Sequence, residues 1–277
     1  MNFFQKILKF IVRNFFKKHH EKELILIGKS HFLNFRPNYK NIKNINDLDY
    51  KIFSQFGEDG IIDYLLYCLK IKSPTFLEIG VGDYSESNTR FLYETTHPKG
   101  MIVDCIKNFR NKIPKNIHLW KGDLTILEKK INSKNVNKVF QNNEFLKKLD
   151  LFSLDIDGID YWVMKNLPDK LSKIVILEYN ATFGPDLEVT VPNLDNFDRS
   201  IYHYSYLCFG ASLKAYVNLM RKRGYIFLGT TLSKINAFFV LESEIKNLNL
   251  EIPDENDFSF FTNSNIRESR SENNDLS

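Results

Sequence analysis

The chain has 277 residues, 43% of them hydrophobic, which is enough for one large domain with its own core. The 38 basic and 34 acidic residues leave a net charge of only +4, so the composition gives no basic surface of the kind that binds nucleic acid. Cys68, Cys105 and Cys208 are odd in number and widely spaced, which argues against a disulfide framework and a zinc site with paired ligands. We therefore expect a cytoplasmic protein.

Residues 1–20 are predicted to form an amphipathic basic helix. Apolar residues recur at helical spacing from Phe3 to Phe16, and lysine and arginine residues occupy the other side. Residues 3–18 then have two interpretations: contact with a membrane surface, at the inner face of the membrane, or packing against the chain's own domain or a second subunit. No long uncharged apolar run exists in the sequence, so no transmembrane helix is predicted.

Two further segments are placed outside the main domain. Residues 21–51, with Pro37 and many asparagines and lysines, are interpreted as a connecting segment. Residues 253–277 are rich in Asn, Ser, Asp and Glu and nearly lack aliphatic residues, so this tail is predicted to be disordered.

Residues 52–245 show strands alternating with helices. Four short apolar runs, 75–78, 100–104, 151–155 and 173–178, each end in an acidic residue and suit strands that are buried on both faces of a parallel sheet. A helix at 212–223 and two strands at 225–229 and 236–241 follow. The predicted fold class is α/β, a Rossmann-like three-layer sandwich whose mostly parallel seven-stranded sheet has a C-terminal antiparallel hairpin strand. Ligands bind such sheets beyond the carboxyl ends of the strands.

A glycine motif follows the first predicted strand. Glu78, Gly80 and Gly82 stand where glycines let the backbone turn tightly and approach a ligand. A dinucleotide-binding fingerprint requires a third glycine at position 85, where this chain has Ser85. The anionic Glu78 disfavours a pyrophosphate and suits the cationic amino and sulfonium groups of S-adenosylmethionine.

Two further acids are predicted to hold that cofactor. Asp104 ends the second predicted strand and is placed to accept hydrogen bonds from both ribose hydroxyls. Asp123, which follows Leu119 to Gly122, is placed to meet the adenine amino group. Each of them has an ordinary alternative as an exposed loop acid.

This order of motifs resembles the class I S-adenosylmethionine-dependent methyltransferases. Residues 53–60, Phe-Ser-Gln-Phe-Gly-Glu-Asp-Gly, are similar to the segment that precedes the fold in FkbM-like members, many of which act on sugars or natural products. The resemblance implies a methyltransferase domain over residues 52–245. It also implies that Gln55 and Glu58 contact the cofactor or cap the loop near Gly80; alternatively, Glu58 only favours a helix N-terminus.

Carboxylates gather after the next two predicted strands. Asp155, Asp157 and Asp160 lie within six residues, and Glu178 and Asn180 close the neighbouring strand. An all-oxygen set made of Asp155, Asp157, Glu178 and Asn180 suits Mg²⁺ and resembles the metal site of catechol-type O-methyltransferases. Two alternatives stay open: the same groups bind substrate hydroxyls or act as general base without metal, or they only cap the local turn.

Residues 181–211 show few strand or helix signals, and loops of this length are often binding loops. His203 lies in this segment, and its near-neutral pKa suits proton removal from a hydroxyl, although a structural role in the tyrosine-rich loop is the alternative.

The sequence thus predicts methyl transfer from S-adenosylmethionine to a hydroxyl group, with Asp155, Asp157 and His203 as the catalytic candidates. A glycan or a small molecule as the acceptor is what the family resemblance implies. Two other functions remain in view. One is a nicotinamide-dependent oxidoreductase, and the other is a noncatalytic glycan- or membrane-associated scaffold that retains the cofactor fold.

Overall fold

The computed structural model describes residues 3–141 and 144–262 and contains a seven-stranded sheet. The strands are β1 (Thr75–Ile79), β2 (Lys99–Asp104), β3 (Asp123–Glu128), β4 (Leu149–Leu154), β5 (Ser172–Glu178), β6 (Tyr225–Thr230) and β7 (Asn236–Leu241). The helices are α1 (Phe3–Phe35), α2 (Glu58–Cys68), α3 (Arg90–Thr96), α4 (Phe109–Lys112), α5 (Val136–Gln141), α6 (Asp160–Asn166), α7 (Arg199–Tyr202) and α8 (Leu213–Lys222).

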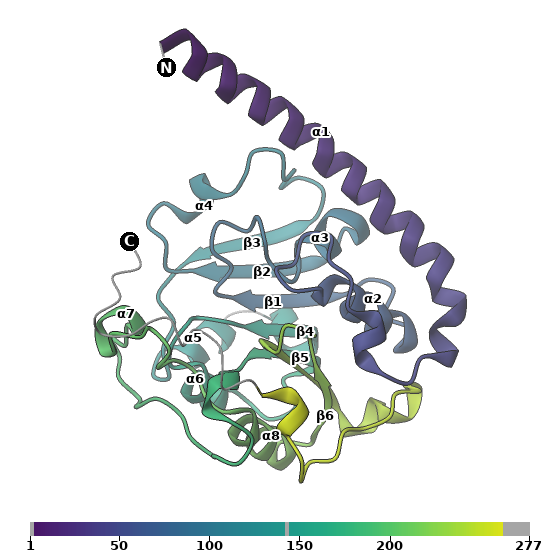
Figure 1. Cartoon of the computed structure of the whole chain (residues 1–277), viewed down its shortest axis with the longest axis vertical. Helices are drawn as coiled ribbons and strands as arrows, with labels where there is room; N and C mark the ends of the chain where they lie inside the picture. The colour runs from purple at the N-terminus through teal and green to yellow at the C-terminus, as the bar shows by residue number, and fades with distance from the viewer. Residues whose placement is uncertain (1–2, 142–143, 263–277) are drawn as a thin grey trace.

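The strand order is β3-β2-β1-β4-β5-β7-β6, and β7 is antiparallel to both of its neighbours. This order confirms the predicted fold class, a Rossmann-like sandwich with a mostly parallel sheet and a reversed C-terminal strand. The chain winds outwards from β1 to β3 and then returns to the other side of β1 as β4 (Figure 1). In open sheets of this kind, a ligand crevice lies at the carboxyl ends of the two strands where the winding reverses.

Helices cover both faces of the sheet because successive side chains of a strand point to opposite faces. In β1, Phe76 packs into the apolar core shared with α2 and α3, whereas Leu77 and Ile79 pack into the core shared with α6 and α8. All three side chains are buried. The apolar residues of the central strands therefore run without interruption, which is the pattern that predicted them.

The N-terminal helix is longer than the sequence pattern predicts, because α1 continues past residue 20 to Phe35. The reason is tertiary packing. Gly28 lies so close to Ile52 and Phe91 that a Cβ atom on it would be 2.8 Å from each side chain, and Phe32 is buried with its ring 5.3 Å from that of Phe91. Figure 1 shows the N-terminal end of α1 extending beyond the outline of the sheet.

The side chains of residues 3–18 lie outside the described part of the structure, so membrane contact and self-association through this segment stay predictions. Within the described residues, helices that combine the length and the apolarity needed to cross a bilayer are absent.

The segment from 21 to 51 belongs to the folded domain rather than being a loose connection. After α1 it forms two 3-10 helices, η1 (Arg36–Asn41) and η2 (Ile45–Leu48). Tyr39, Ile45 and Leu48 are buried in the core on the α2 side of the sheet. The sequence conceals this because its buried residues are separated by asparagines and lysines that face solvent.

The predicted tail also begins too early. Residues 253–262 pack on the domain, with Phe258 and Phe261 buried in the core on the α8 side of the sheet. The Tyr179 hydroxyl donates a hydrogen bond to the Phe261 carbonyl oxygen. The rest of the predicted disordered tail, residues 263–277, lies outside the described residues.

This packing predicts that Phe261→Ala lowers the free energy of unfolding by about 3 kcal/mol, because it leaves a cavity beside Phe227. Phe260→Ala is the matched control, since Phe260 is 59% exposed and Phe261 is 8% exposed. The control should change stability by less than about 0.5 kcal/mol. Urea unfolding of both variants measures the difference, and equal losses would show that the 253–262 segment does not dock.

Candidate functional site

A cavity of about 470 Å³ opens at the carboxyl ends of β1, β2 and β4, where the winding of the sheet reverses. Its wall contains the glycine loop after β1, Asp104 at the end of β2, and Asp155 after β4. Parallel strands bring these residues together because their carboxyl ends all meet at one edge of the sheet. We call this cavity the crevice.

Gly80 and Gly82 line the crevice, and each position requires a glycine for a different reason. Gly80 has φ of 84°, and a Cβ atom on it would overlap the backbone carbonyl oxygen of Asp155. Gly82 has φ of 58° and no atom within 4 Å of its Cβ position. Gly80 is therefore needed so that β1 and β4 can approach each other, whereas Gly82 is needed only for its backbone conformation.

Glu78 is buried, and its carboxyl group binds the end of the loop after β1, at Asn88 and Thr89. Its Oε1 accepts a hydrogen bond from the Asn88 amide at 2.9 Å, and its Oε2 accepts from the Thr89 amide at 3.0 Å and from the Thr89 hydroxyl. Burial raises the pKa of Glu78 to about 7, although the hydrogen bonds from Thr89 and Asn88 act against this. Glu78 thus lines the crevice and also fixes the loop that closes it.

Asp104 ties the end of β2 to the same loop. Its Oδ2 accepts hydrogen bonds from the amides of Val81 at 3.0 Å and Gly82 at 2.9 Å, and its Oδ1 accepts from the Ile106 amide. The carboxylate therefore stands at the lip of the crevice, where it was predicted to meet ribose hydroxyls. A ligand hydroxyl at this position would share the carboxylate with the loop amides.

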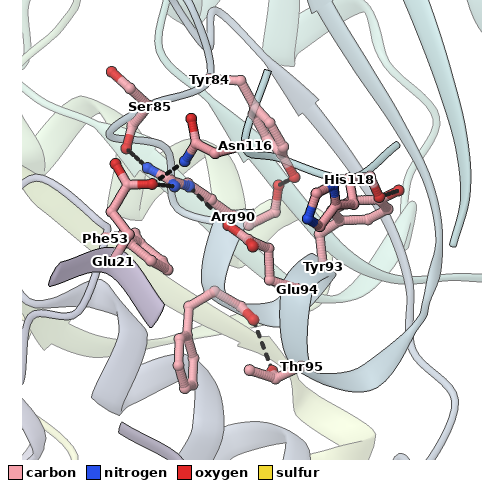
Figure 2. A network of polar contacts seen from close by, with 12 residues as sticks. Glu21, Phe53, Tyr84, Ser85, Arg90, Tyr93, Glu94, Thr95, Asn116 and His118 are labelled. Atoms are coloured by element: carbon pink, nitrogen blue, oxygen red, sulfur yellow. Dashed lines mark hydrogen bonds and ion pairs between the residues drawn. The ribbon is translucent and has the colours of Figure 1, made fainter. Parts of the chain in front are cut away.

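Arg90 holds the loop from the side of α3, as Figure 2 shows. The guanidinium is only 2% exposed, donates to the Ser85 carbonyl oxygen at 2.8 Å and to Glu94 at 3.0 Å, and lies 3.8 Å from the centre of the Phe53 ring. Its Nη2 forms a 2.8 Å ion pair with Glu21 of α1. The loop that borders the crevice is thus connected to the N-terminal helix through one buried cation.

Asp155, which lines the crevice, forms a close carboxyl pair with Glu178 at the end of β5. Burial raises the pKa of Asp155 to about 7, with Asp160 and Asp157 adding to the shift. Burial and the neighbouring Asp155 raise the pKa of Glu178 well above its ordinary value. Glu178 Oε2 is buried without a hydrogen-bond partner among the described residues. Two buried carboxylates this close cannot both stay ionised, so the pair holds a proton or a cation.

Asp155, Asp157 and Glu178, the acidic cluster, have the spacing of ligands for a divalent cation, but Asp157 already has a cationic partner. One oxygen each from Asp155, Asp157 and Glu178 lie within 4.8 Å of one another, which is close to the spacing of ligands around a hard cation. Asp157 also forms an ion pair with Arg199 in the long loop, so a cation there would compete with that arginine.

Asn180, the fourth predicted ligand, has another role. Its Nδ2 donates to the carbonyl oxygens of Leu207 and Phe209, and its Oδ1 accepts from the amide and hydroxyl of Thr182. The side chain is buried, and both of its polar atoms are engaged. The structure thus assigns Asn180 to fixing the path of the long loop, and we remove it from the ligand set.

Asp123 is not part of the crevice. It is the first residue of β3, pairs in register with Lys99 at the start of β2, and forms a 3.2 Å ion pair with that lysine. It therefore lies at the amino ends of the strands, whereas Gly80 and Asp104 lie at the carboxyl ends. The part of the chain near β3 that lines the crevice is instead the segment after this strand, with Lys129, Lys130 and Ile131.

His203 is likewise not among the residues that line the crevice. Its Nδ1 lies 2.7 Å from the Ser205 hydroxyl, and its ring lies 4.3 Å from that of Tyr204. These contacts support the structural interpretation of this histidine.

The segment that leads into α2 contributes Gln55 to the crevice, and Glu58, the first residue of α2, supports it. Gln55 is exposed and lines the crevice. Glu58 is fully buried; it accepts from the Phe56 amide at 2.8 Å and from Asn236 Nδ2 at 2.6 Å. Asn236 borders the crevice and faces Glu178 across the β5–β7 pair, and its Oδ1 is buried without a partner among the described residues. In the sequence, Asn236 is marked only by its position just after the turn between the last two strands.

The crevice is strongly acidic. Among the described residues that line it, seven are acidic and two are lysines. The acids are Glu78, Asp83, Glu86, Asp104, Asp155, Asp157 and Asp195, and the lysines are Lys129 and Lys130. A negative potential in a cleft attracts cationic ligands and repels a pyrophosphate.

No protein-family model matches the chain, and no curated protein matches it. Solved structures that resemble it include an O-methyltransferase family protein from Burkholderia thailandensis (12% identity, 66% of this chain and 57% of that chain, TM-score 0.40). Others are TrmK of M. capricolum in complex with S-adenosyl-homocysteine (11%, 64% and 65%, 0.35) and a SAM-dependent methyltransferase from Aquifex aeolicus (10%, 70% and 94%, 0.36).

The chain thus spans less than two thirds of the length of the first two of these structures. Scores this low assign no activity, and the fold rests on the strand order and directions described above.

The two glycines predict a contrast between variants. Gly80→Ala should strongly destabilise the fold, because its Cβ would force the ends of β1 and β4 apart. Gly82→Ala should cost only about 1–2 kcal/mol, the strain of a left-handed residue in open space. Thermal unfolding of both variants tests this contrast, which equal losses of stability would contradict.

The carboxyl pair predicts a pH-dependent stability. Between about pH 4 and pH 7, the folded protein keeps a proton on Asp155 that the unfolded chain has released. The contribution of Asp155 to the free energy of unfolding is therefore fully present below about pH 4, the ordinary pKa of an aspartic acid. It is lost as the pH rises through about 7, the pKa of Asp155 in the fold. In Asp155→Asn the loss should be smaller by about 1.4 kcal/mol per pH unit within this window.

Urea unfolding between pH 4 and 8 measures the effect. Glu78, Asp59 and Asp160 also have raised pKa values, so only the difference between variant and wild type isolates the pair. Asp195→Asn, an exposed residue of the same crevice, is the control. Parallel stability curves for wild type and Asp155→Asn would contradict the prediction.

Proposed function

We propose that this chain is an S-adenosylmethionine-dependent methyltransferase that methylates a hydroxyl group. The observation that carries the proposal is the acidic crevice itself: a glycine loop, the Asp104 carboxylate and a carboxyl pair meet where the winding of a Rossmann-like sheet reverses. A positively charged nucleoside fits this site chemically, and a dinucleotide pyrophosphate does not.

The donor half of the crevice has distinct tasks for its residues. Gly80 and Gly82 keep the floor free of side chains, and Asp104 offers a carboxylate at the lip for ribose hydroxyls. Glu78 holds the loop through the amides of Asn88 and Thr89. S-adenosylmethionine, when bound, supplies an electrophilic methyl group on a sulfonium that becomes a neutral thioether on transfer.

The acceptor half centres on Asp155 and Glu178. With the proton of the pair on Glu178, the ionised Asp155 accepts the proton of the acceptor hydroxyl as the acceptor oxygen forms its bond to the methyl carbon. The raised pKa of Asp155, about 7, suits this role because a general base is most effective with a pKa near the working pH. The protein otherwise orients the two reactants and excludes water.

A divalent cation such as Mg²⁺ fits the same oxygens. Asp155, Asp157 and Glu178 would hold it, and a cation there lowers the pKa of an acceptor hydroxyl. The unpartnered Glu178 Oε2 supports this, because a buried carboxylate oxygen without a hydrogen bond is costly.

The acceptor class follows from the loop over the crevice and from the FkbM-like resemblance of residues 53–60. Phe197 and Asp195 line the crevice from this loop, and Arg199 connects it to Asp157. An aromatic ring beside carboxylates suits a sugar or another hydroxylated small molecule.

The donor site predicts that S-adenosylhomocysteine binds the wild-type chain and that Asp104→Ala weakens binding by about 1.5–3 kcal/mol, the scale for hydrogen bonds to a charged group. Asp123→Ala is the matched control and should bind as wild type does, since it lies at the other end of the strands. Isothermal titration calorimetry measures both. Stabilisation by NADH in place of S-adenosylhomocysteine would instead indicate an oxidoreductase.

The acidic cluster predicts that Mg²⁺ raises the melting temperature of the wild-type chain relative to EDTA, because ligands of the folded state stabilise it. The gain should disappear in Glu178→Gln and persist in Asp195→Asn. Differential scanning fluorimetry measures these shifts. Identical melting of the wild type in Mg²⁺ and EDTA would leave the metal-free base as the mechanism.

A further inference from the structure

A second cavity, of about 750 Å³, lies between α1, α2 and α3, and Asn88 is the one described residue that lines both it and the crevice. Its walls are mostly apolar: Phe32, Leu33, Ile62, Leu66, Phe91 and Leu92. Pro74, next to the start of β1, also borders it, which places part of this cavity near the amino ends of the strands, whereas the crevice lies at their carboxyl ends. Its size is within the range of cavities that hold small ligands. We call it the α1 cavity.

Cationic side chains surround this apolar space. Lys29, Lys70 and Lys72 line the α1 cavity, and none of the three forms an ion pair within the described residues. Arg36 also lines it, but Asp63 neutralises this arginine through a 2.6 Å ion pair. Three uncompensated lysines beside an apolar space favour a ligand with an apolar body and an anionic head.

The orientation of such a ligand follows from the remaining acid in the wall. Asp59 borders the α1 cavity and is buried, and its Oδ1 has no partner among the described residues. A buried carboxyl group repels an anionic head, whereas the lysines are exposed to solvent and attract it. The head therefore belongs among the lysines, with the apolar part inside.

Beside the cavity, α1 also exposes apolar side chains among its polar ones. Leu26 is 68% exposed, Ile27 is 53% exposed, and Leu33, which lines the cavity, is 65% exposed. A free fatty acid in the cavity would leave Leu26 and Ile27 in water, whereas a bilayer surface would cover them. In the sequence, the same helix begins with the alternating apolar and basic residues of 3–18.

We propose that the α1 cavity takes an acyl chain of an anionic phospholipid from a membrane surface, with Lys29, Lys70 and Lys72 on its head group. Each methylene group transferred from water into the cavity contributes favourably, and so does each lysine near an anionic surface. This site is independent of the proposed methyl transfer, and its tests need neither the methyl donor nor an acceptor.

The first experiment measures sedimentation of the full chain with vesicles of phosphatidylcholine, with and without phosphatidylglycerol. The chain should bind only the vesicles that contain phosphatidylglycerol. Lys29→Glu/Lys70→Glu/Lys72→Glu should weaken this binding by more than about tenfold at low salt. The matched control, Lys115→Glu/Lys138→Glu/Lys222→Glu, changes the same net charge at exposed lysines that do not line the α1 cavity and should weaken binding less.

The second experiment locates the acyl chain through Cys68, which lines the α1 cavity. With Cys105→Ser and Cys208→Ser, Cys68 is the remaining thiol, and its reaction with a maleimide is followed over time. Vesicles with phosphatidylglycerol should slow labelling of Cys68, whereas phosphatidylcholine vesicles should not.

Three outcomes would overturn the proposal. The first is no binding to vesicles of either composition, or equal binding by both triple variants. The second is binding without protection of Cys68, which would show that α1 adsorbs to the bilayer while the cavity takes no lipid. The third is protection of Cys68 by dispersed laurate but not by vesicles, which would identify a free fatty acid as the ligand.

Discussion

The organisation of the site depends on how closely the ends of β1 and β4 approach each other. The backbone of Gly80 rests against the carbonyl oxygen of Asp155, and only a residue without Cβ permits this contact. The Asp155 amide in turn donates to the Ile79 carbonyl oxygen at 3.0 Å. This contact makes the glycine loop and the carboxyl pair neighbours, so that one crevice has a donor side and an acceptor side.

The charge of the crevice follows from how its carboxyl groups are compensated. Glu78 and Asp104 accept hydrogen bonds from backbone amides, and these bonds fix the loop after β1. Asp155 and Glu178 lack comparable donors and repel each other, so they need a proton or a cation. The first pair suits binding of a cationic nucleoside, and the second suits acid–base chemistry.

The sequence predicts the central strands well and the periphery poorly, for a physical reason. Strands buried on both faces are continuous apolar runs, so β1, β2, β4 and β5 are visible in the sequence. The edge strand β3 alternates exposed and half-buried residues and starts at Asp123, so the pattern places this acid at the wrong end of the strand. Asn180 has an amide oxygen suited to a metal, and only the fold shows that Thr182 occupies it. The docking of α1 through Glu21 and Arg90 involves residues far apart in the sequence and leaves no local signal.

The most direct test of this account is a crystal structure of the chain grown with S-adenosylhomocysteine. The nucleoside should lie in the crevice, with its ribose hydroxyls on the Asp104 carboxylate and its amino acid end over Gly80, facing Asp155. A crevice that stays closed by its own side chains while the ligand is present at saturating concentration, or a ligand bound elsewhere on the molecule, would contradict it.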